Sequence, residues 1–136
     1  KFFVETLNVM GSDFGTVAGK RRIIPLNIYA LDIEEMPRYS NRKYPIEILR
    51  GKTIKNSNIF NIPEGYTIES IPKPEDLITD FGSLKTEVSI EEGKILMVQT
   101  FVLKDGIWDA GKYTSFRDFL QSVRINSNQK AVIIQN

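Results

Sequence analysis

The sequence contains no cysteine and no histidine among its 136 residues. Cysteine and histidine supply structural zinc sites and most of the nucleophile–base pairs used in hydrolysis. The chain therefore cannot carry out a Cys-His or Ser-His-Asp reaction by itself, and an enzyme would have only carboxylates, hydroxyls, lysines and tyrosines. We expect a protein that is not an enzyme and has no catalytic, cofactor-binding or metal-binding residues. The lack of cysteine leaves the cellular compartment open, because disulfides are not required of exported proteins.

An excess of charge of one sign is also missing, since 18 basic residues face 17 acidic ones. A net charge of +1 gives no global attraction to nucleic acid or to an anionic membrane. No apolar run approaches the roughly 20 residues of a membrane-spanning helix. A local basic patch could form, but no stacking aromatics are interleaved with it, so we interpret it as a solvated edge. Its residues would be Lys20, Arg21, Arg22, Arg38, Arg42 and Lys43.

Two pairs of adjacent carboxylates, Glu34-Glu35 and Glu91-Glu92, raise the question of a glycosidase site. Such a site needs two carboxylates that converge on one bond. Neighbouring residues on a strand point to opposite faces, so Glu91 and Glu92 should not converge. We interpret both pairs as parts of solvated turns or loops.

Strand patterns dominate what is present. Leu84 to Glu91 alternates between apolar and polar residues, the period of a half-buried antiparallel strand. The segment Glu92-Gly93-Lys94 is typical of a turn, and Ile95 to Leu103 is then apolar on both faces. The pattern predicts a hairpin whose second strand is central and covered on each side.

Further segments also favour strands. They are Phe3 to Val9, Arg22 to Tyr29, Pro45 to Leu49, Ile54 to Ile62, Tyr66 to Ile71 and Lys130 to Gln135. The first two flank a polar segment whose glycines, Gly11, Gly15 and Gly19, resemble hairpin glycines. Pro25 has no amide donor, so it predicts an edge or bulged position for the strand that contains it.

One helix is predicted just before the last strand. Thr114 or Ser115 can cap its amino end, and Asn126-Ser127-Asn128 ends it. Its apolar residues fall on one face, which makes it a candidate cover for the second apolar face of the Ile95 to Leu103 strand. These residues are Phe116, Phe119, Leu120 and Val123.

The element pattern predicts an all-β fold. We expect an antiparallel β-sandwich of two sheets, immunoglobulin-like or jelly-roll-like, with one short C-terminal α-helix before the last strand. No repeat, low-complexity tract or linker interrupts the chain, so residues 1–136 should form a single domain.

Four aromatic residues are the candidates for a ligand or interface site: Trp108, Tyr113, Tyr39 and Tyr44. Together they could form a platform on which sugar rings stack. Each also lies beside a predicted strand end or helix start, where aromatic side chains commonly close the rim of a core. Both interpretations stay open at this point.

Three motifs follow one another in a recognisable order. They are Ile62-Pro63-Glu64-Gly65-Tyr66, Asp80-Phe81-Gly82-Ser83 and Tyr113-Thr114-Ser115-Phe116-Arg117-Asp118-Phe119-Leu120, with Asn41 to Ile48 upstream. In this series the chain resembles the C-terminal domain of unknown function of bacterial, mostly Bacteroides-group, transglutaminase-like or protease-like proteins. The resemblance covers residues 41–136 well and residues 1–40 only loosely. Its motifs are structural: Pro63 suits the second position of a type I turn and Gly65 the fourth, which favours a corner between strands over a ligand loop.

The resemblance implies a context for the chain. It begins without methionine, directly in strand-like sequence, so we expect a piece from the C-terminal end of a larger protein. Such parents are generally exported, which implies the periplasm or the cell surface. An upstream domain would carry the catalytic Cys, His and Asp, none of which maps onto this sequence. The expected function is that of a non-catalytic accessory domain whose partner is that catalytic domain, which predicts an exposed apolar patch on this one. The alternative is a cell-surface module that binds glycan or protein.

Overall fold

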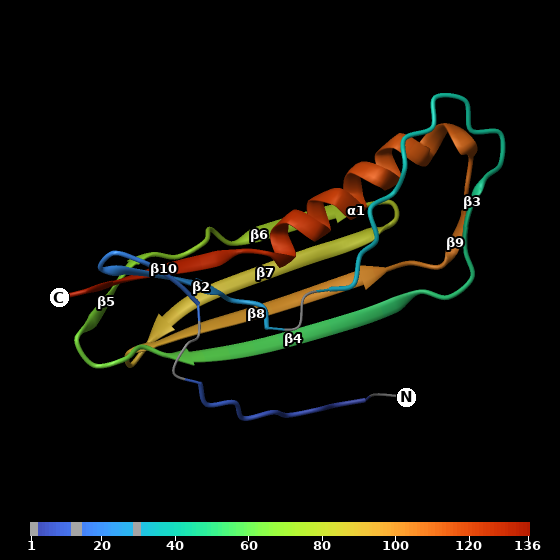
Figure 1. Ribbon diagram of the computed structural model, residues 1–136. Helices are drawn as coiled ribbons and strands as arrows, with labels where there is room; N and C mark the ends of the chain where they lie inside the picture. The colour runs from blue at the N-terminus through green and yellow to red at the C-terminus, as the bar shows by residue number, and fades with distance from the viewer. Residues whose placement is uncertain (1–2, 12–14, 29–30) are drawn as a thin grey trace.

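The fold consists of two four-stranded antiparallel sheets, a short two-stranded ladder and one helix (Figure 1). The computed structural model describes residues 3–11, 15–28 and 31–136. The first sheet, here called the β10 sheet, has the order β1 (Thr16–Ala18), β2 (Arg21–Pro25), β10 (Lys130–Gln135) and β5 (Tyr66–Ser70). The second, the β8 sheet, has the order β4 (Lys52–Asn61), β8 (Lys94–Leu103), β7 (Gly82–Glu91) and β6 (Glu75–Thr79).

The helix and the last strand lie in one layer. The short ladder joins β3 (Ile46–Ile48) to β9 (Gly106–Trp108), and a 3-10 turn, η1 (Ala110–Lys112), leads into α1 (Tyr113–Ser127). Figure 1 shows α1 continuing into β10 along the same side of the β8 sheet. This arrangement confirms the predicted two-sheet, all-β sandwich with a short helix before the last strand. Within the described ranges, no helix is both long enough and apolar enough to cross a bilayer.

Two hydrophobic cores fill the space between the layers. One, here called the helix core, lies between α1 and the β8 sheet, and the other, the strand core, lies between the two sheets. The buried residues of the helix core are Leu31, Ile46, Phe81, Leu84, Phe101, Tyr113, Phe116, Phe119 and Val123. Those of the strand core are Ile24, Leu26, Ile95, Met97, Ala131 and Ile133.

Strand β8 contributes one face to both cores. Ile95, Met97, Gln99 and Phe101 are buried on that face, and the phenyl rings of Phe101 and Phe119 stack at 6.2 Å. The prediction that the helix covers the second apolar face of this strand is therefore wrong. Because α1 continues directly into β10, both must lie on the same side of β8. The residues on the other face, 96, 98, 100 and 102, are only half-buried.

The central hairpin agrees with its sequence pattern. Strands β7 and β8 pair in antiparallel register from Gly82–Leu103 to Glu91–Lys94. The two turn residues, Glu92 and Gly93, have φ values of 47° and 73°. Positive φ at both central residues is the signature of a type I′ turn, whose twist matches that of the flanking strands.

The amino-terminal third differs from expectation. Residues 3–11 form no strand and are exposed, so the prediction of a strand from Phe3 to Val9 is wrong. The segment has strand-like composition, but no described strand lies beside it to complete a sheet. Strand β2 lies between β1 and β10 and pairs with both without a register shift, so the edge or bulged position predicted from Pro25 is wrong as well. Pro25 is tolerated because it ends β2, beyond the Thr16–Ile23 pair where β1 stops. Tyr29, the predicted end of that strand, lies outside the described residues.

The segment from Pro63 to Tyr66 is a corner between the two sheets, joining β4 to β5. The Tyr66 amide donates to the Pro63 carbonyl at 3.2 Å, and Gly65 has a φ of 83°. Pro63 is therefore the first residue of the turn and Gly65 the third. A positive φ at the third position defines a type II turn, so the predicted type I assignment is wrong.

Candidate functional site

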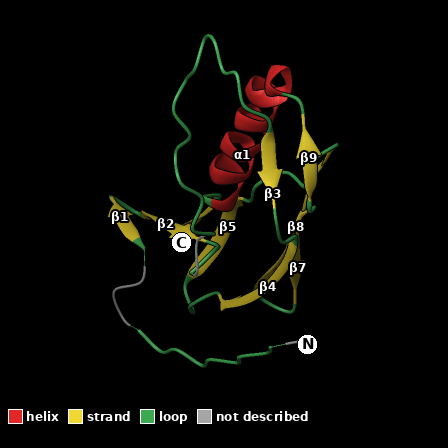
Figure 2. Ribbon diagram, turned by 90° about the vertical axis from the view of Figure 1, so that its right-hand side faces the viewer, coloured by secondary structure: helices red, strands yellow, loops and turns green. Residues whose placement is uncertain are grey.

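Two of the four candidate aromatics lie together at the amino end of α1. The rings of Tyr39 and Tyr113 have centroids 5.5 Å apart. Tyr113 is the first residue of α1 and is buried, while Tyr39 lies in the long connection between β2 and β3 and is 55% exposed. Figure 2 shows the connection between β2 and β3 passing around the helix start before it descends into β3.

Specific contacts fix this connection to the helix. The Tyr113 hydroxyl donates to the Pro37 carbonyl at 2.6 Å, and the Arg42 guanidinium lies 4.7 Å above the Tyr113 ring. Arg42 also donates through Nε and Nη2 to the carbonyls of Tyr44 and Pro45, at 2.9 and 3.2 Å. Tyr113 and Arg42 therefore position the connection, which leaves the Tyr39 ring partly open to solvent.

The other two candidate aromatics do not join this pair. Tyr44 is 80% exposed, and only its backbone carbonyl takes part in the contacts around Arg42. Trp108 packs on Phe81 with ring centroids 5.1 Å apart, at the rim of the helix core. The structure thus brings together two of the four candidate residues, and of these only Tyr39 has an exposed ring, because Tyr113 is buried.

A hollow of about 310 Å³ opens beside Tyr39. We call it the arginine–tyrosine pocket, and it lies between the connection and the first turn of α1. No acidic residue lines it. Its lining residues are Arg38, Tyr39, Ser40, Tyr113, Thr114 and Arg117.

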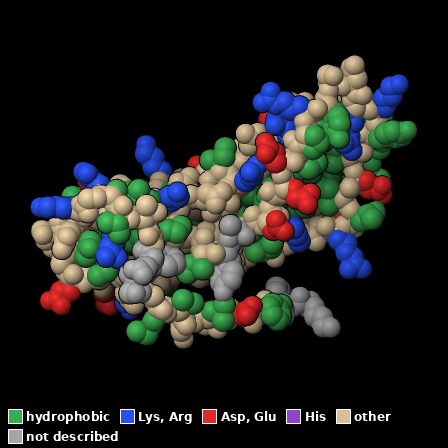
Figure 3. Space-filling view, in the orientation of Figure 1, with side chains coloured by type: hydrophobic (Ala, Val, Ile, Leu, Met, Phe, Trp, Pro, Cys, Tyr) green, Lys and Arg blue, Asp and Glu red, His purple; other side chains and the backbone are tan. Residues whose placement is uncertain are grey.

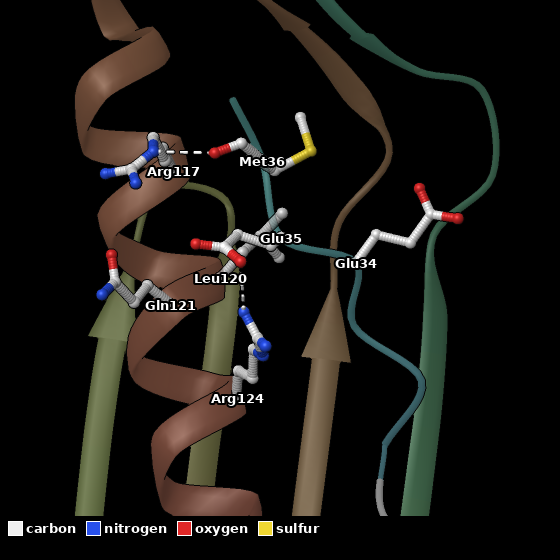
Figure 4. Close-up of a pocket in the computed structure, with 7 residues that line it drawn as sticks. All are labelled: Glu34, Glu35, Met36, Arg117, Leu120, Gln121 and Arg124. Carbon is white, nitrogen blue, oxygen red and sulfur yellow. Dashed lines mark hydrogen bonds and ion pairs between the residues drawn. The ribbon is translucent and has the colours of Figure 1, made fainter. Parts of the chain in front are cut away.

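A second, much smaller crevice of about 10 Å³ follows the same helix (Figure 4). Arg117 Nε donates to the Met36 carbonyl at 2.8 Å, and Arg124 lies 3.3 Å from the Glu35 carboxylate. Figure 4 shows Glu35 directed toward Arg124 and Glu34 directed away from it, so the two carboxylates do not converge. The crevice has room for about one water molecule and is part of the seam that holds the connection.

The candidate basic patch is divided between two parts of the molecule. Arg21 forms a bidentate pair with Glu69 across the β10 sheet, with a shortest distance of 2.7 Å, and the Arg22 guanidinium lies over the Tyr66 ring. The hydrogen bond from Arg21 lowers the pKa of the Glu69 carboxyl. Arg38 and Arg42 lie instead at the amino end of α1, where Figure 3 shows Lys and Arg side chains at the surface.

The outer face of the β8 sheet carries an apolar stripe that sequence reasoning did not single out. Ile59 lies opposite Leu96, and Ile78 and Val102 both lie opposite Ser83. Ile59 is 64% exposed and Ile78 is 76% exposed. We call this set the outer stripe: Ile59, Ile78, Leu96, Val98 and Val102. In residues 3–11, 15–28 and 31–136, no group of three acidic side chains is arranged to hold a metal ion.

Comparison with known proteins gives a family and a fold. Residues 20–133 match a family described as a domain of unknown function with a solved structure, DUF3858. The fold is similar to a crystal structure from Parabacteroides distasonis, titled a "putative protease", with a TM-score of 0.66 and 13% sequence identity. The similarity covers 84% of this chain and 23% of that chain, so the chain spans about a quarter of the length of the solved protein. The search of curated proteins found no match.

Proposed function

Since the chain belongs to the DUF3858 family, we propose that it is a non-catalytic accessory domain of a larger, exported transglutaminase-like or protease-like protein. In this role it packs against the catalytic domain and stabilises it or shapes its substrate cleft. The outer stripe is the observation that carries the proposal.

The outer stripe has the composition of an interface. Leu96, Val98 and Val102 come from β8, a central strand of the sheet. Apart from Ile59, the residues opposite them are polar: Thr53 and Ser57 on β4, and Ser83, Glu87 and Ser89 on β7. An apolar centre with a polar rim is the usual anatomy of a protein–protein contact. The stripe has two apolar parts, Ile59 with Leu96 and Val98, and Val102 with Ile78, and the row of Lys55, Thr100 and Lys85 lies between them. Exposed apolar groups on a soluble domain commonly mark such a contact.

The chemistry of the chain supports the same role. Without cysteine or histidine, the groups for a transglutaminase or papain-like reaction have to come from another domain. The similar fold in the Parabacteroides distasonis structure occupies 23% of that chain, which leaves most of it for other domains. An exported location is part of the proposal.

The test uses a full-length parent protein with Leu96→Lys and Val98→Lys together. Both side chains point away from the cores, so the 136-residue chain alone should lose about 1 kcal/mol or less of stability per substitution. In the full-length protein we expect a lower unfolding temperature of the catalytic domain, faster proteolysis at the domain boundary, or reduced activity. Thr16→Lys, an exposed residue of edge strand β1 in the other sheet, is the matched control. Unchanged stability, proteolysis and activity in the double variant would rule out this face as the contact.

The alternative, a surface module that binds glycan or protein, has one observation in its favour. The exposed Tyr39 ring lies in a pocket with two arginines and two hydroxyl side chains. The ligand that these groups fit is considered next.

A further inference from the structure

The arginine–tyrosine pocket has a one-sided charge. Arg38 is exposed and has no hydrogen-bond or ion-pair partner within the described part of the chain. Arg117 uses Nε on the Met36 carbonyl, which leaves its two terminal nitrogens for another acceptor. The first turn of α1 contains no acidic side chain, and its N-cap residue, Lys112, makes no side-chain capping bond.

The geometry of the guanidinium groups favours a planar anion. A guanidinium presents parallel N–H donors at the spacing of two carboxylate oxygens, so a bidentate pair forms with little loss of side-chain freedom. Arg117 is held in place by its bond to Met36, at 2.8 Å. One of the two cations is thus already oriented before a ligand arrives, which lowers the entropy cost of binding.

The remaining walls fit a ring with hydroxyl groups. The Tyr39 ring is 55% exposed and packs at a tilt of 50° on Tyr113, whose own hydroxyl is bonded to Pro37. An exposed aromatic face can pack against the C–H face of a sugar. Ser40 and Thr114 line the same hollow and can donate or accept hydrogen bonds with ring hydroxyls. The volume of about 310 Å³ lies at the lower end of the range for small-molecule sites.

We propose that the arginine–tyrosine pocket binds a carboxylate-bearing sugar, a uronic acid at the end or within a short glycan. Arg38 and Arg117 bind the carboxylate, Tyr39 packs against the sugar ring, and Ser40 and Thr114 bond its hydroxyls. The site is independent of the outer stripe, which lies on the far side of the β8 sheet. It can therefore operate whether or not the chain packs against a catalytic domain.

The experiment titrates the 136-residue chain with trigalacturonic acid, followed by amide NMR shifts and calorimetry. Galactotriose, of the same length but neutral, is the first comparison, and inorganic phosphate and a dipeptide with a free carboxylate are the others. We expect trigalacturonic acid to bind at least tenfold more tightly than each of these, with shifts concentrated at residues 38–40 and 113–117. Equal or tighter binding of galactotriose, phosphate or the dipeptide would overturn the assignment, as would no saturation at millimolar trigalacturonic acid.

Two variants locate the site. Removing a charge-assisted hydrogen bond typically weakens binding by about ten- to a hundredfold, so Arg38→Gln should reduce the affinity by at least tenfold. Arg38 is exposed, so the variant should keep the thermal midpoint of the original chain. Arg50→Gln removes the same charge from an exposed position between β3 and β4 and should leave the affinity unchanged. Tyr39→Ala should also weaken binding. If Arg50→Gln weakens binding as much as Arg38→Gln, the attraction is non-specific and the proposal fails.

Discussion

Gln99 links the two cores, and its replacement by leucine should destabilise the domain strongly. Its side chain is 1% exposed in the middle of β8. Its carbonyl accepts from Asn27 Nδ2 at 3.1 Å, and its amide donates to Thr86 Oγ1 at 3.1 Å and, more weakly, to the Asn126 carbonyl at 3.4 Å. These contacts join the connection after β2, strand β7 and the end of α1.

The magnitude follows from the groups that Gln99→Leu would leave behind. The leucine has nearly the same volume, so little cavity forms, but Asn27 and Thr86 would lose their partner. Asn27 Oδ1 is already buried without a partner, so that amide could not compensate within the described structure. Each newly unsatisfied buried group costs about 1–3 kcal/mol, and the gain from burying leucine offsets part of that. We expect a net loss of about 2–4 kcal/mol, or roughly 6–16 °C in the thermal midpoint of a domain of this size.

The assay is urea denaturation of the 136-residue chain, followed by fluorescence and circular dichroism. A double-mutant cycle with Asn27→Leu separates the pair, since removing both partners should cost less than the sum of the single changes. Val98→Leu, a neighbouring substitution on the outer face of the same strand, should change stability by less than about 0.5 kcal/mol. If Gln99→Leu is as stable as the original chain, or more so, the hydrogen bonds of Gln99 contribute nothing to folding and this reasoning is wrong.

Three further substitutions test other parts of the structure. Gly82→Ala should cost about 3 kcal/mol in urea denaturation, because a Cβ there would lie 1.8 Å from the Val102 carbonyl oxygen, whereas Gly111→Ala, which has open space around it, should be nearly neutral. Glu69→Gln should destabilise the chain at pH 7 but lose that effect in acid: Arg21 lowers the folded-state pKa of Glu69, so its stabilisation is present above the ordinary value of 4.5 and is lost as the pH falls through the folded pKa. Denaturation at pH 7 and pH 3 measures the difference, and an effect of equal size at both would contradict it. Tyr113→Phe removes the 2.6 Å hydrogen bond to the Pro37 carbonyl and should lower the free energy of unfolding by about 1 kcal/mol. If this bond positions the connection, amide hydrogen exchange should also become faster throughout residues 31–45, which a purely local loss would not produce.

Those elements whose pattern is local could be predicted from the sequence. The β7–β8 hairpin follows from alternation on both sides of Glu92-Gly93, and α1 follows from its apolar face and the Asn126-Ser127-Asn128 end. The predicted cap residues were Thr114 or Ser115, whereas α1 begins at Tyr113 with Lys112 as its N-cap. The start differs because η1 leads directly into the helix without a side-chain cap. The sequence pattern does not predict strands β1, β6 and β9, because the pairing of each depends on a partner strand rather than on its own alternation.

The motif Asp80-Phe81-Gly82-Ser83 shows what a resemblance can and cannot provide. The family match confirms a domain of unknown function, the coarser part of the resemblance, yet the motif did not reveal why these residues are used. In the structure Phe81 packs against Trp108, Phe116 and Phe119, and Lys104 donates to its carbonyl at 2.8 Å. The turn therefore places an aromatic ring in the centre of the helix core, and Gly82 lets two backbone segments approach closely.

The candidate site was only half predictable. Tyr39 and Tyr113 were named for their ring chemistry, but nothing in the sequence brings together two residues so far apart in the chain. Their meeting depends on the Tyr113 hydroxyl reaching Pro37 and on Arg42 lying over the Tyr113 ring. The sequence suggests Arg38 only as part of a basic patch. That Arg38 has no acidic partner among the described residues becomes visible only in the fold, where nearby Glu35 forms its ion pair with Arg124.

The transition from α1 to β10 explains why Gln99 and its hydrogen-bond partners lie where they do. A helix leaves its last carbonyls without intrahelical donors. At the end of α1, Ser127 is buried in the sandwich, while Ile125 and Asn128 are exposed. Ser127 and Asn128 both donate side-chain hydrogen bonds to the Arg124 carbonyl, at 2.9 and 3.0 Å, and Gln99 reaches the carbonyl of Asn126. The polar residues from which the sequence pattern predicts the end of the helix thus also donate hydrogen bonds to its last carbonyls. Because only two residues separate the end of α1 from the start of β10, the same contacts hold the helix and the last strand in one layer.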